Sequence, residues 1–222
     1  MSKDNIDSGA NREKLTKLWA DYGNEIFEKF IEDNILEGAL LCRDLGIFTH
    51  GKFKGGNTLL CIEAAKNSRE MAEFLIDHGT DVNIYHDGWT PLQWAAKFNS
   101  QETVKLLIDR GADISAKDNT GQTSLHHAVR EKFIETAQLL IDCGADIHAK
   151  DDSGQTPLHI AAKYGRKEIA QMLIGQGADI RAKNNAGQTP LDIAVSNKAK
   201  EVASNESKET VILLKKYERK QK

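Results

Sequence analysis

The chain has 222 residues, of which 33 are Asp or Glu and 30 are Lys or Arg, so its formal net charge at pH 7 is −3. This near balance gives no overall field that would attract nucleic acid or a membrane surface. No apolar run is long enough to span a bilayer, and residues 1–12 are polar rather than signal-like, so we expect a cytoplasmic protein. The three cysteines lack metal-ligand spacing, so we expect reduced thiols, no metal and no cofactor.

The N-terminal part of the chain precedes the clear sequence pattern. Residues 1–11 are polar, and we expect them to be disordered. Over residues 12–46 apolar side chains recur at helical spacing, as in Leu15, Leu18, Trp19 and Tyr22. We interpret 12–46 as a helical N-terminal cap with a possible degenerate repeat, because the open end of a stacked array needs a covering unit. The alternative is a separate functional module.

One unit then recurs along the chain with a period close to 33 residues. A turn glycine stands two residues before each motif threonine, and a second series of glycines recurs in step with the first. The threonines are Thr58, Thr90, Thr123, Thr156 and Thr189, and the second glycines are Gly79, Gly111, Gly144 and Gly177. Such a period predicts stacked supersecondary units.

The fourth copy shows why each unit should fold as a turn, a helix, a corner and a second helix. Thr156 can cap the first helix with its hydroxyl, Pro157 suits the first helical position, and His159 stands where a capping box needs a side chain reaching back. Gly165 suits a left-handed corner between the helices, and Gly177 suits the end of the second helix.

These offsets make residues 47 to about 217 resemble the ankyrin-repeat family. The resemblance implies an all-α solenoid of helix pairs with projecting β-hairpin fingers. It also implies a concave surface, made by fingertips and inner helices, that binds other proteins. In that family the histidine three residues after the threonine, here His126 and His159, forms hydrogen bonds within and between repeats. We therefore assign these histidines to structure rather than to a metal or an active site.

The C-terminal end departs from the period. We assign 47–195 to the repeat array and 196–222 to a C-terminal capping repeat with an insertion and a basic tail. The outer-helix signature, residues 209–214, arrives eight residues late, and the polar stretch 197–207 before it suits a loop or a lengthened inner helix. A polar last helix with a basic final turn is what a terminal cap needs.

Two sequence stretches resemble ligand sites only weakly. Residues 51–58 have the glycine spacing of a phosphate-binding loop, but Asn57 stands where the lysine is needed. Residues 151–154 hint at calcium, yet the glycine is misplaced for an EF-hand loop and no bidentate glutamate follows. Every other candidate nucleophile, base or ligand occupies an ordinary repeat position, so we predict no enzyme.

The second repeat departs most from the others. Its finger is one residue short, and Trp89 replaces the glutamines of later repeats. Because aromatic side chains dominate binding energy at interfaces, we predict a protein-binding patch here. Its residues are Tyr85, His86, Asp87, Trp89, Lys97, Phe98, Arg130 and Tyr164. Trp94 is assigned to the core. The alternative is that the short finger folds its aromatics onto the neighbouring repeat.

Basic residues also recur in register. The inner helices carry Lys97, Arg130 and Lys163, and the fingers carry Lys117, Lys150 and Lys183. We interpret them as a solvated face, because exposed charges at such positions contribute little energy. If a partner uses them, they would steer an acidic one.

One finger asparagine resembles a known modification site. Asn83 follows Leu75 by eight residues, as does the asparagine that the family's asparaginyl hydroxylase modifies in animal cells. We expect the modification only where the protein meets such an enzyme.

The predicted function is a non-catalytic protein-protein interaction module, acting as an adaptor, scaffold or inhibitor and monomeric on its own. Its partner is a protein, with no role for nucleic acid or membrane. The alternative is that 12–46 carries a separate activity that the repeats target to a protein substrate, as in effectors that intracellular bacteria deliver into host cells.

Overall fold

The computed structural model describes residues 59–77, 79–198 and 205–220. The predictions for 1–11 and 12–46, and the turn before the first clear repeat, lie outside these ranges. The helices in chain order are α3 (Leu59–Lys66), α4 (Arg69–Asp77), α5 (Pro91–Lys97), α6 (Gln101–Asp109), α7 (Ser124–Glu131), α8 (Ile134–Asp142), α9 (Pro157–Tyr164), α10 (Lys167–Gly175), α11 (Pro190–Lys198) and α12 (Asn205–Lys220). None of them is both long and apolar enough to cross a bilayer.

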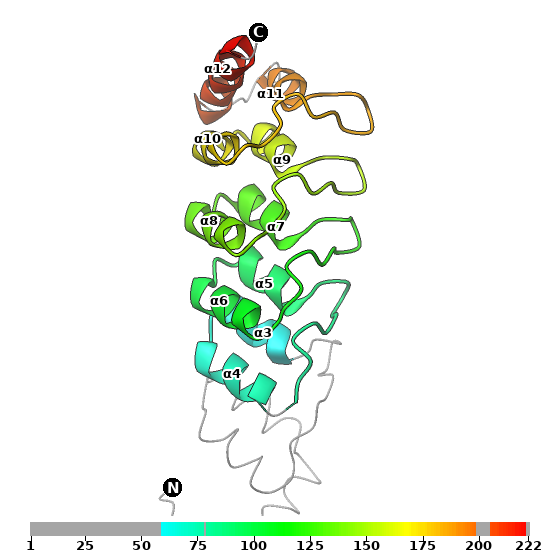
Figure 1. The fold of residues 1–222 in the computed structure, drawn as a ribbon, viewed down its shortest axis with the longest axis vertical. Coiled ribbons are helices and arrows are strands. Elements are labelled where there is room, and N and C mark those ends of the chain that lie inside the picture. Colours follow the sequence, from blue (N-terminus) through cyan, green and yellow to red (C-terminus); the bar gives the residue numbers. More distant parts are fainter. Residues whose placement is uncertain (1–58, 78, 199–204, 221–222) are drawn as a thin grey trace, which may run out of the picture.

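The helices form two layers that run the length of a stack (Figure 1). The inner helices α3, α5, α7, α9 and α11 each contact the next in the series, and so do the outer helices α4, α6, α8, α10 and α12. The loops that join one pair to the next project from one edge as fingers (Figure 1). Over the described residues this confirms the predicted all-α solenoid of helix pairs.

The histidines of the motif join the third repeat to the fourth and the fourth to the fifth. His126 Nδ1 accepts a hydrogen bond from the Thr123 backbone N–H (3.2 Å), so its Nε2 carries the proton and donates to the Gln155 carbonyl (3.2 Å). His159 repeats the pattern toward the Gln188 carbonyl (3.1 Å). The prediction that these histidines bond within and between repeats is confirmed.

The corners between paired helices have left-handed backbone at Asn67, Asn99, Lys132 and Gly165. Glycine and asparagine tolerate this conformation, whereas lysine has no such advantage. At Lys132, φ is 69° and ψ is 30°. This corner therefore carries backbone strain that the other three largely avoid.

The second finger is built differently from those after it. The third and fourth fingers close with bonds from Asp118 N–H to the Gln122 carbonyl and from Asp151 N–H to the Gln155 carbonyl. In the second finger His86 and Trp89 exchange both backbone bonds, at 2.8 and 2.9 Å, around Asp87 and Gly88. Both central residues have positive φ, 49° and 79°. This is the two-residue turn that Asp-Gly favours, and it explains the missing residue.

The last helix pair follows the delayed pattern of the sequence. The inner helix α11 ends at Lys198, and α12 begins at Asn205, one turn before the signature 209–214. Residues 205–207, predicted as part of a loop or of a lengthened inner helix, thus belong to the outer helix α12. Val211 and Leu214 are each 2 % exposed and complete the core, so α12 takes the outer-helix place beside α10.

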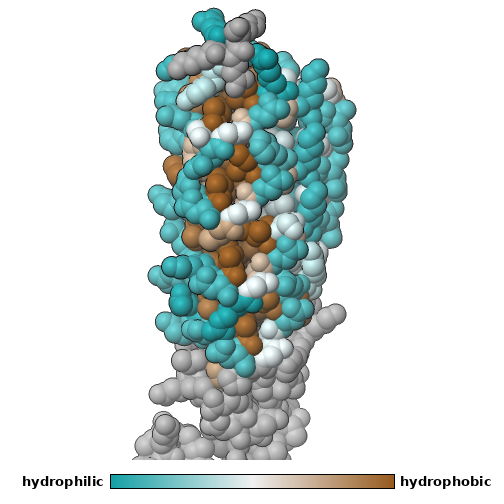
Figure 2. Space-filling model, in the orientation of Figure 1, coloured by the Kyte–Doolittle hydropathy of each residue, from teal (hydrophilic) through white to brown (hydrophobic). Residues whose placement is uncertain are grey.

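The core is continuous from α3 to α12. Each repeat adds leucines and alanines that are almost wholly buried, including Leu92, Leu107, Leu125, Leu140, Leu158 and Leu173. Partly buried side chains pack against it in register, including Ile76, Ile108, Ile141 and Ile174. Figure 2 shows a hydrophobic band running along the stack between polar surfaces. Burial shared between neighbours is what stabilises a repeat array.

Candidate functional site

Four rings from two repeats form a row on the inner side of the second repeat. Trp89 comes from the finger, Trp94 from α5, Phe98 from the residue that caps α5, and His127 from α7. The ring centroids of Trp89 and His127 are 4.0 Å apart, those of Trp89 and Trp94 are 5.2 Å apart, and those of Trp94 and Phe98 are 6.0 Å apart. We call these four residues the aromatic row.

A cation lies over this row. Lys97 Nζ is 4.8 Å from the ring centroid of Trp89, 5.6 Å from that of Trp94 and 5.7 Å from that of Phe98. An ammonium this close to a ring face is attracted by the ring quadrupole, and each such contact is worth about 0.5–1 kcal/mol at exposed sites. The three rings therefore hold the lysine head in place at the surface.

The row rests on a buried hydrogen bond between His127 and Asp118. His127 Nε2 lies 2.9 Å from Asp118 Oδ2, and both side chains are 2 % exposed. Burial lowers the pKa of His127 to about 4, although the neighbouring Asp118 opposes the shift. The imidazole is thus neutral at pH 7, and its Nε2–H donates to the carboxylate.

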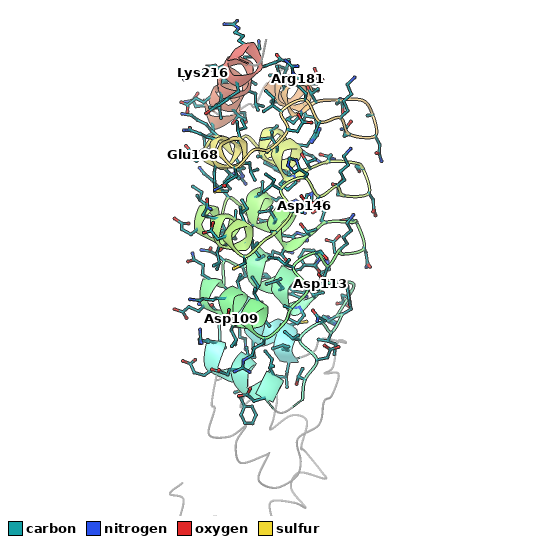
Figure 3. The ribbon with its side chains drawn as sticks, in the orientation of Figure 1. Asp109, Asp113, Asp146, Glu168, Arg181 and Lys216 are labelled. Atoms are coloured by element: carbon teal, nitrogen blue, oxygen red, sulfur yellow. The ribbon has the colours of Figure 1, made fainter. Side chains whose placement is uncertain are left out.

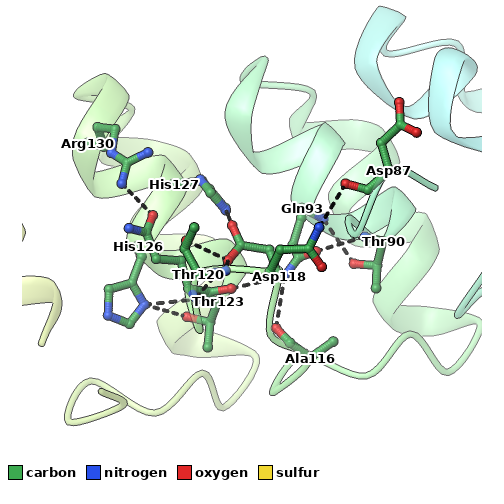
Figure 4. Close-up of polar contacts among 12 residues, drawn as sticks. Asp87, Thr90, Gln93, Ala116, Asp118, Thr120, Thr123, His126, His127 and Arg130 are labelled. Atoms are coloured by element: carbon green, nitrogen blue, oxygen red, sulfur yellow. Dashed lines mark hydrogen bonds and ion pairs between the residues drawn. The ribbon is translucent and has the colours of Figure 1, made fainter. Parts of the chain in front are cut away.

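Asp118 also shapes the third finger. Its Oδ1 accepts hydrogen bonds from the Thr120 N–H (2.8 Å), the Thr120 hydroxyl (2.7 Å) and the Gln122 N–H (3.0 Å) (Figure 4). Burial alone would raise the pKa of Asp118, but these bonds together with His127 outweigh burial and lower it. One carboxylate therefore connects the finger turn, α7 and the aromatic row.

The predicted patch residues of the second repeat divide by exposure. Tyr85 and Phe98 are 53 % and 51 % exposed, and the Asp87 side chain is 69 % exposed. Trp89 and Lys97 are half-buried. These five residues are accessible from outside to different degrees.

His86 does not share that exposure. Only 4 % of the residue is accessible, and its Nε2 lies 2.8 Å from Asp87 Oδ2 beneath the finger. Side chains alternate along an extended finger, so His86 turns inward where its neighbour Tyr85 turns outward. The expectation that His86 presents itself on the surface is corrected by the structure.

The assignment of Trp94 to the core is also wrong. Trp94 is half-buried, stacks on the ring of Phe98 and makes a tilted contact with that of Trp89. Trp94 and His127 occupy the same position in successive repeats, four residues after Thr90 and Thr123, where later repeats have Ile160 and Ile193. Because Trp94 and His127 both replace isoleucine at one repeat position, the sequence already indicated that their rings face the same side of the array.

Arg130 and Tyr164 form a second group farther along the stack. Arg130 Nη2 donates to Gln122 Oε1 (2.5 Å), and the guanidinium carbon lies 5.9 Å from the ring centroid of Tyr164. Lys163 Nζ lies 5.6 Å from the same ring, and Tyr164 is 39 % exposed. Two basic side chains, Arg130 and Lys163, thus lie near the exposed ring of Tyr164.

The short finger does fold one aromatic onto its neighbour, as the alternative interpretation held. Trp89 covers His127 of the next repeat. Tyr85 and Phe98 nevertheless remain about half exposed. Trp89 is therefore the base of the surface, and Phe98 and Tyr85 are its outward side chains.

Asn83 is held by the following repeat. Its Nδ2 donates to the Gly111 carbonyl (3.2 Å), and its Oδ1 accepts from the Asp113 N–H (2.7 Å). The structure thus gives this asparagine a packing role between fingers. Its modification stays a prediction.

Among the residues that the structure describes, no three or more His, Cys, Asp and Glu side chains gather in a group that could hold a metal ion. The histidines of α7 are instead engaged as described, His126 with a finger carbonyl and His127 with Asp118.

Comparison with known families agrees with this geometry. A family model described as ankyrin repeats (3 copies) matches residues 19–118, 60–151 and 125–214. A comparison with curated proteins gives no match. Ankyrin repeats generally mediate protein-protein interaction and are typically non-catalytic. The matched ranges cover most of the chain, and the helix pairs, fingers and bonded histidines recur in the same register, so the chain belongs to the ankyrin-repeat family.

Proposed function

We propose that this chain is a non-catalytic module that binds a protein partner through the inner surface of its second repeat. The observation that carries the proposal is the exposure of Phe98 and Tyr85 beside a lysine already held over three rings. Aromatic side chains that project from a supported surface are the residues that most often dominate interface energy.

Preorganisation supports this role. Binding loses free energy when flexible side chains become ordered at an interface. Here Trp89 is already stacked on His127, and Lys97 is already held over the rings. Because these side chains lose little freedom on association, an open surface of modest size can still bind with useful affinity.

The buried His127–Asp118 pair does not favour a catalytic interpretation. Both side chains are 2 % exposed, Trp89 stacks on the imidazole, and the carboxylate already accepts four hydrogen bonds. A general base must reach the proton that it removes. This pair instead supports the surface from below.

The test is affinity capture with matched variants of the full chain. Phe98→Ala removes a ring that is 51 % exposed, and we expect it to abolish capture of the partner that the wild-type chain retains. Ile212→Ala is the control, because Ile212 is 64 % exposed but lies on the last helix, α12. Equal capture by wild type and Phe98→Ala, with unchanged circular dichroism, would contradict the proposal.

The module acts in the cytoplasm as an adaptor, scaffold or competitive inhibitor, and as a monomer. Residues 12–46 then serve as the N-terminal cap rather than as an effector domain that the repeats deliver to a host protein. Deleting residues 1–46 separates these roles. Loss of a cap exposes core and leads to aggregation, whereas loss of an independent domain leaves a soluble array that still captures the partner.

A further inference from the structure

Charge is segregated across the repeat in a way that the balanced composition hides. Three positions of each repeat lie along the inner surface: the finger edge, the residue before the motif threonine, and the basic position near the end of the inner helix. In the second to fifth repeats the finger edge has Tyr85, Lys117, Lys150 and Lys183. The residue before the threonine is Trp89, Gln122, Gln155 or Gln188, and the position near the helix end is Lys97, Arg130, Lys163 or Ser196. Six of these twelve residues are basic and none is acidic.

Contacts place these positions together. Lys97 lies over Trp89, and Arg130 donates to Gln122, so the finger base and the helix end meet in two successive repeats. In the next repeat the corresponding Gln155 and Lys163 line one hollow. Along the fingers, Lys117 Nζ donates to the Lys150 carbonyl (2.8 Å) and Lys150 Nζ to the Lys183 carbonyl (3.2 Å). The basic residues therefore recur from repeat to repeat along the inner side, and we call them the basic line.

The acidic residues recur elsewhere, where they have local roles. Figure 3 labels Asp109 and Glu168 on the outer helices and Asp113 and Asp146 in the loops that leave them. The loop aspartates cap their own turns: Asp113 accepts from the Ser115 N–H (2.8 Å) and Asp146 from the His148 N–H (2.8 Å). A chain of net charge −3 thus carries basic residues at these inner positions, while the outer helices α4, α6, α8 and α10 together hold eight acidic and three basic residues.

A hollow between the fourth and fifth repeats fits a carboxylate. It has a volume of about 200 Å³ and is lined by side chains that include Lys163, Gln155, Gln188 and Asn184. One ammonium and three side-chain amides offer the donors that a carboxylate accepts from. Three of its lining residues, Gln155, Lys163 and Gln188, occupy the repeat positions of Gln122, Arg130 and Trp89.

We infer that the partner contributes an acidic, extended segment that runs along this inner surface. An apolar side chain of that segment covers Phe98 and the aromatic row, and its carboxylates pair with Lys97, Arg130 and Lys163. The inference rests on the proposed function and adds the chemistry of the partner. Complementary charge of this kind mainly sets association rate and partner choice, while the aromatic anchor supplies affinity.

An acidic peptide fits better than a nucleic acid. Exposed acids interrupt the basic line at Asp87, Glu131 and Asp152. A nucleic-acid backbone carries regularly and closely spaced phosphates, so it would bring charge against these carboxylates. A peptide can space its carboxylates to avoid them. In addition, Lys117 and Lys150 are already engaged with finger carbonyls.

The test uses three fluorescein-labelled peptides and one RNA against the full chain. The first peptide repeats Glu, Gly and Ser around a central Leu-Phe pair, the second replaces every Glu by Gln, and the third replaces every Glu by Lys. The RNA is a single-stranded oligonucleotide of similar length. We expect fluorescence anisotropy to show binding of the Glu peptide that weakens as salt rises, and weaker binding of the other three probes.

Charge-reversed variants locate the site. The double variant Arg130→Glu/Lys163→Glu should weaken binding of the Glu peptide by roughly ten-fold or more. Lys105→Glu is the control, because this exposed residue of the outer helix α6 also reverses a positive charge. If Lys105→Glu weakens peptide binding as much per reversed charge, the effect is one of net charge and the inference is overturned. Binding of the Lys peptide, the Gln peptide or the RNA as tight as that of the Glu peptide, or tighter, would also overturn it.

Failure here is distinguishable from failure of the proposed function. If capture of the natural partner depends on Phe98 but is unchanged in Arg130→Glu/Lys163→Glu, the interaction surface stands and the acidic partner is wrong. If neither change affects capture, both are wrong.

Discussion

The rings of Trp89 and His127 stack with their centroids 4.0 Å apart, although one comes from a finger and the other from the inner helix of the next repeat. His127 in turn donates to the buried carboxylate of Asp118. The surface aromatic row is thereby tied to a polar pair inside the array, which links partner binding to the stability of two neighbouring repeats.

Replacing His127 should destabilise the array more than loss of a stacked ring alone. His127→Ile inserts the side chain that later repeats have at this position, but it leaves the Asp118 carboxylate buried without its ring donor. We expect a loss of about 1–3 kcal/mol in the free energy of unfolding. Urea denaturation followed by circular dichroism measures it, with Asp118→Asn/His127→Ile as the companion that removes the charge. A double variant no more stable than the single one would show that the buried charge is not the cause.

Stability should fall on acidification through His127. Its pKa is about 4 in the folded chain, below the ordinary value of 6.5, so the unfolded state binds a proton first. The stabilisation is fully present above pH 6.5 and is lost as the pH falls toward 4, by up to about 3 kcal/mol. Burial lowers the pKa of His126 and His159 as well, so the comparison is with His127→Ile. Identical urea midpoints against pH for the two chains would contradict this assignment.

Removing Glu63 should stabilise the first described repeat. Glu63 is 0 % exposed on α3, where other repeats have alanine, and Lys66 Nζ lies 3.6 Å from its Oε1. Burial raises the pKa of Glu63, with Ser68 and Lys66 opposing the shift. The folded state therefore favours the protonated form of Glu63. The contribution of this group to the stability of the fold is fully present below pH 4.5 and is lost as the pH rises through the pKa of Glu63 in the folded chain.

Glu63→Ala should accordingly unfold at higher urea concentration than wild type at pH 7, by about 1–3 kcal/mol. The difference should shrink as the pH is lowered to 4. Glu70→Ala, an exposed glutamate of the next helix, is the matched control. A stabilisation that persists unchanged at low pH would point to helix propensity rather than to the buried charge.

Relieving the left-handed corner at Lys132 should also stabilise the fold. Gly165 occupies the same corner in the next repeat, and Lys132→Gly removes the steric cost of φ at 69°, which is about 1 kcal/mol. The substitution also removes the ion pair between Lys132 and Glu206 of α12, which as a partly exposed pair is worth about 0–1 kcal/mol. Thermal unfolding of Lys132→Gly, Glu206→Gln and wild type separates the two effects. Destabilisation by Lys132→Gly larger than that by Glu206→Gln would show that the corner is not strained.

Local features of the fold followed directly from residue types at fixed offsets. Threonine caps, the corner at Gly165 and the bonded histidines at His126 and His159 depend on neighbours within one repeat or on the repeat period. The short finger was visible as a missing residue, and its Asp87-Gly88 turn is the conformation that such a dipeptide favours. The late C-terminal helix was visible from the signature 209–214, although α12 begins a turn earlier because polar residues also extend a helix.

The candidate surface was harder to predict. Trp94 has the size and apolarity of a core residue but is only half-buried, and His86 has the polarity of a surface residue but is buried. Lys97 is an ordinary solvated lysine in sequence terms and is held over three rings in space. Residue type alone could not show which side of a short helix or finger each side chain would face.

The amino-acid sequence by itself determined the repeat, its register, its caps and its corners, because these depend on interactions between residues close together in the chain or one period apart. Only the tertiary structure decided that Trp89 covers His127, that Trp94 joins Phe98 under Lys97, and that basic residues of successive repeats come together along one side. Those relationships arise when one repeat stacks on the next, since the stacking brings side chains from a finger, an inner helix and a neighbouring repeat onto one surface.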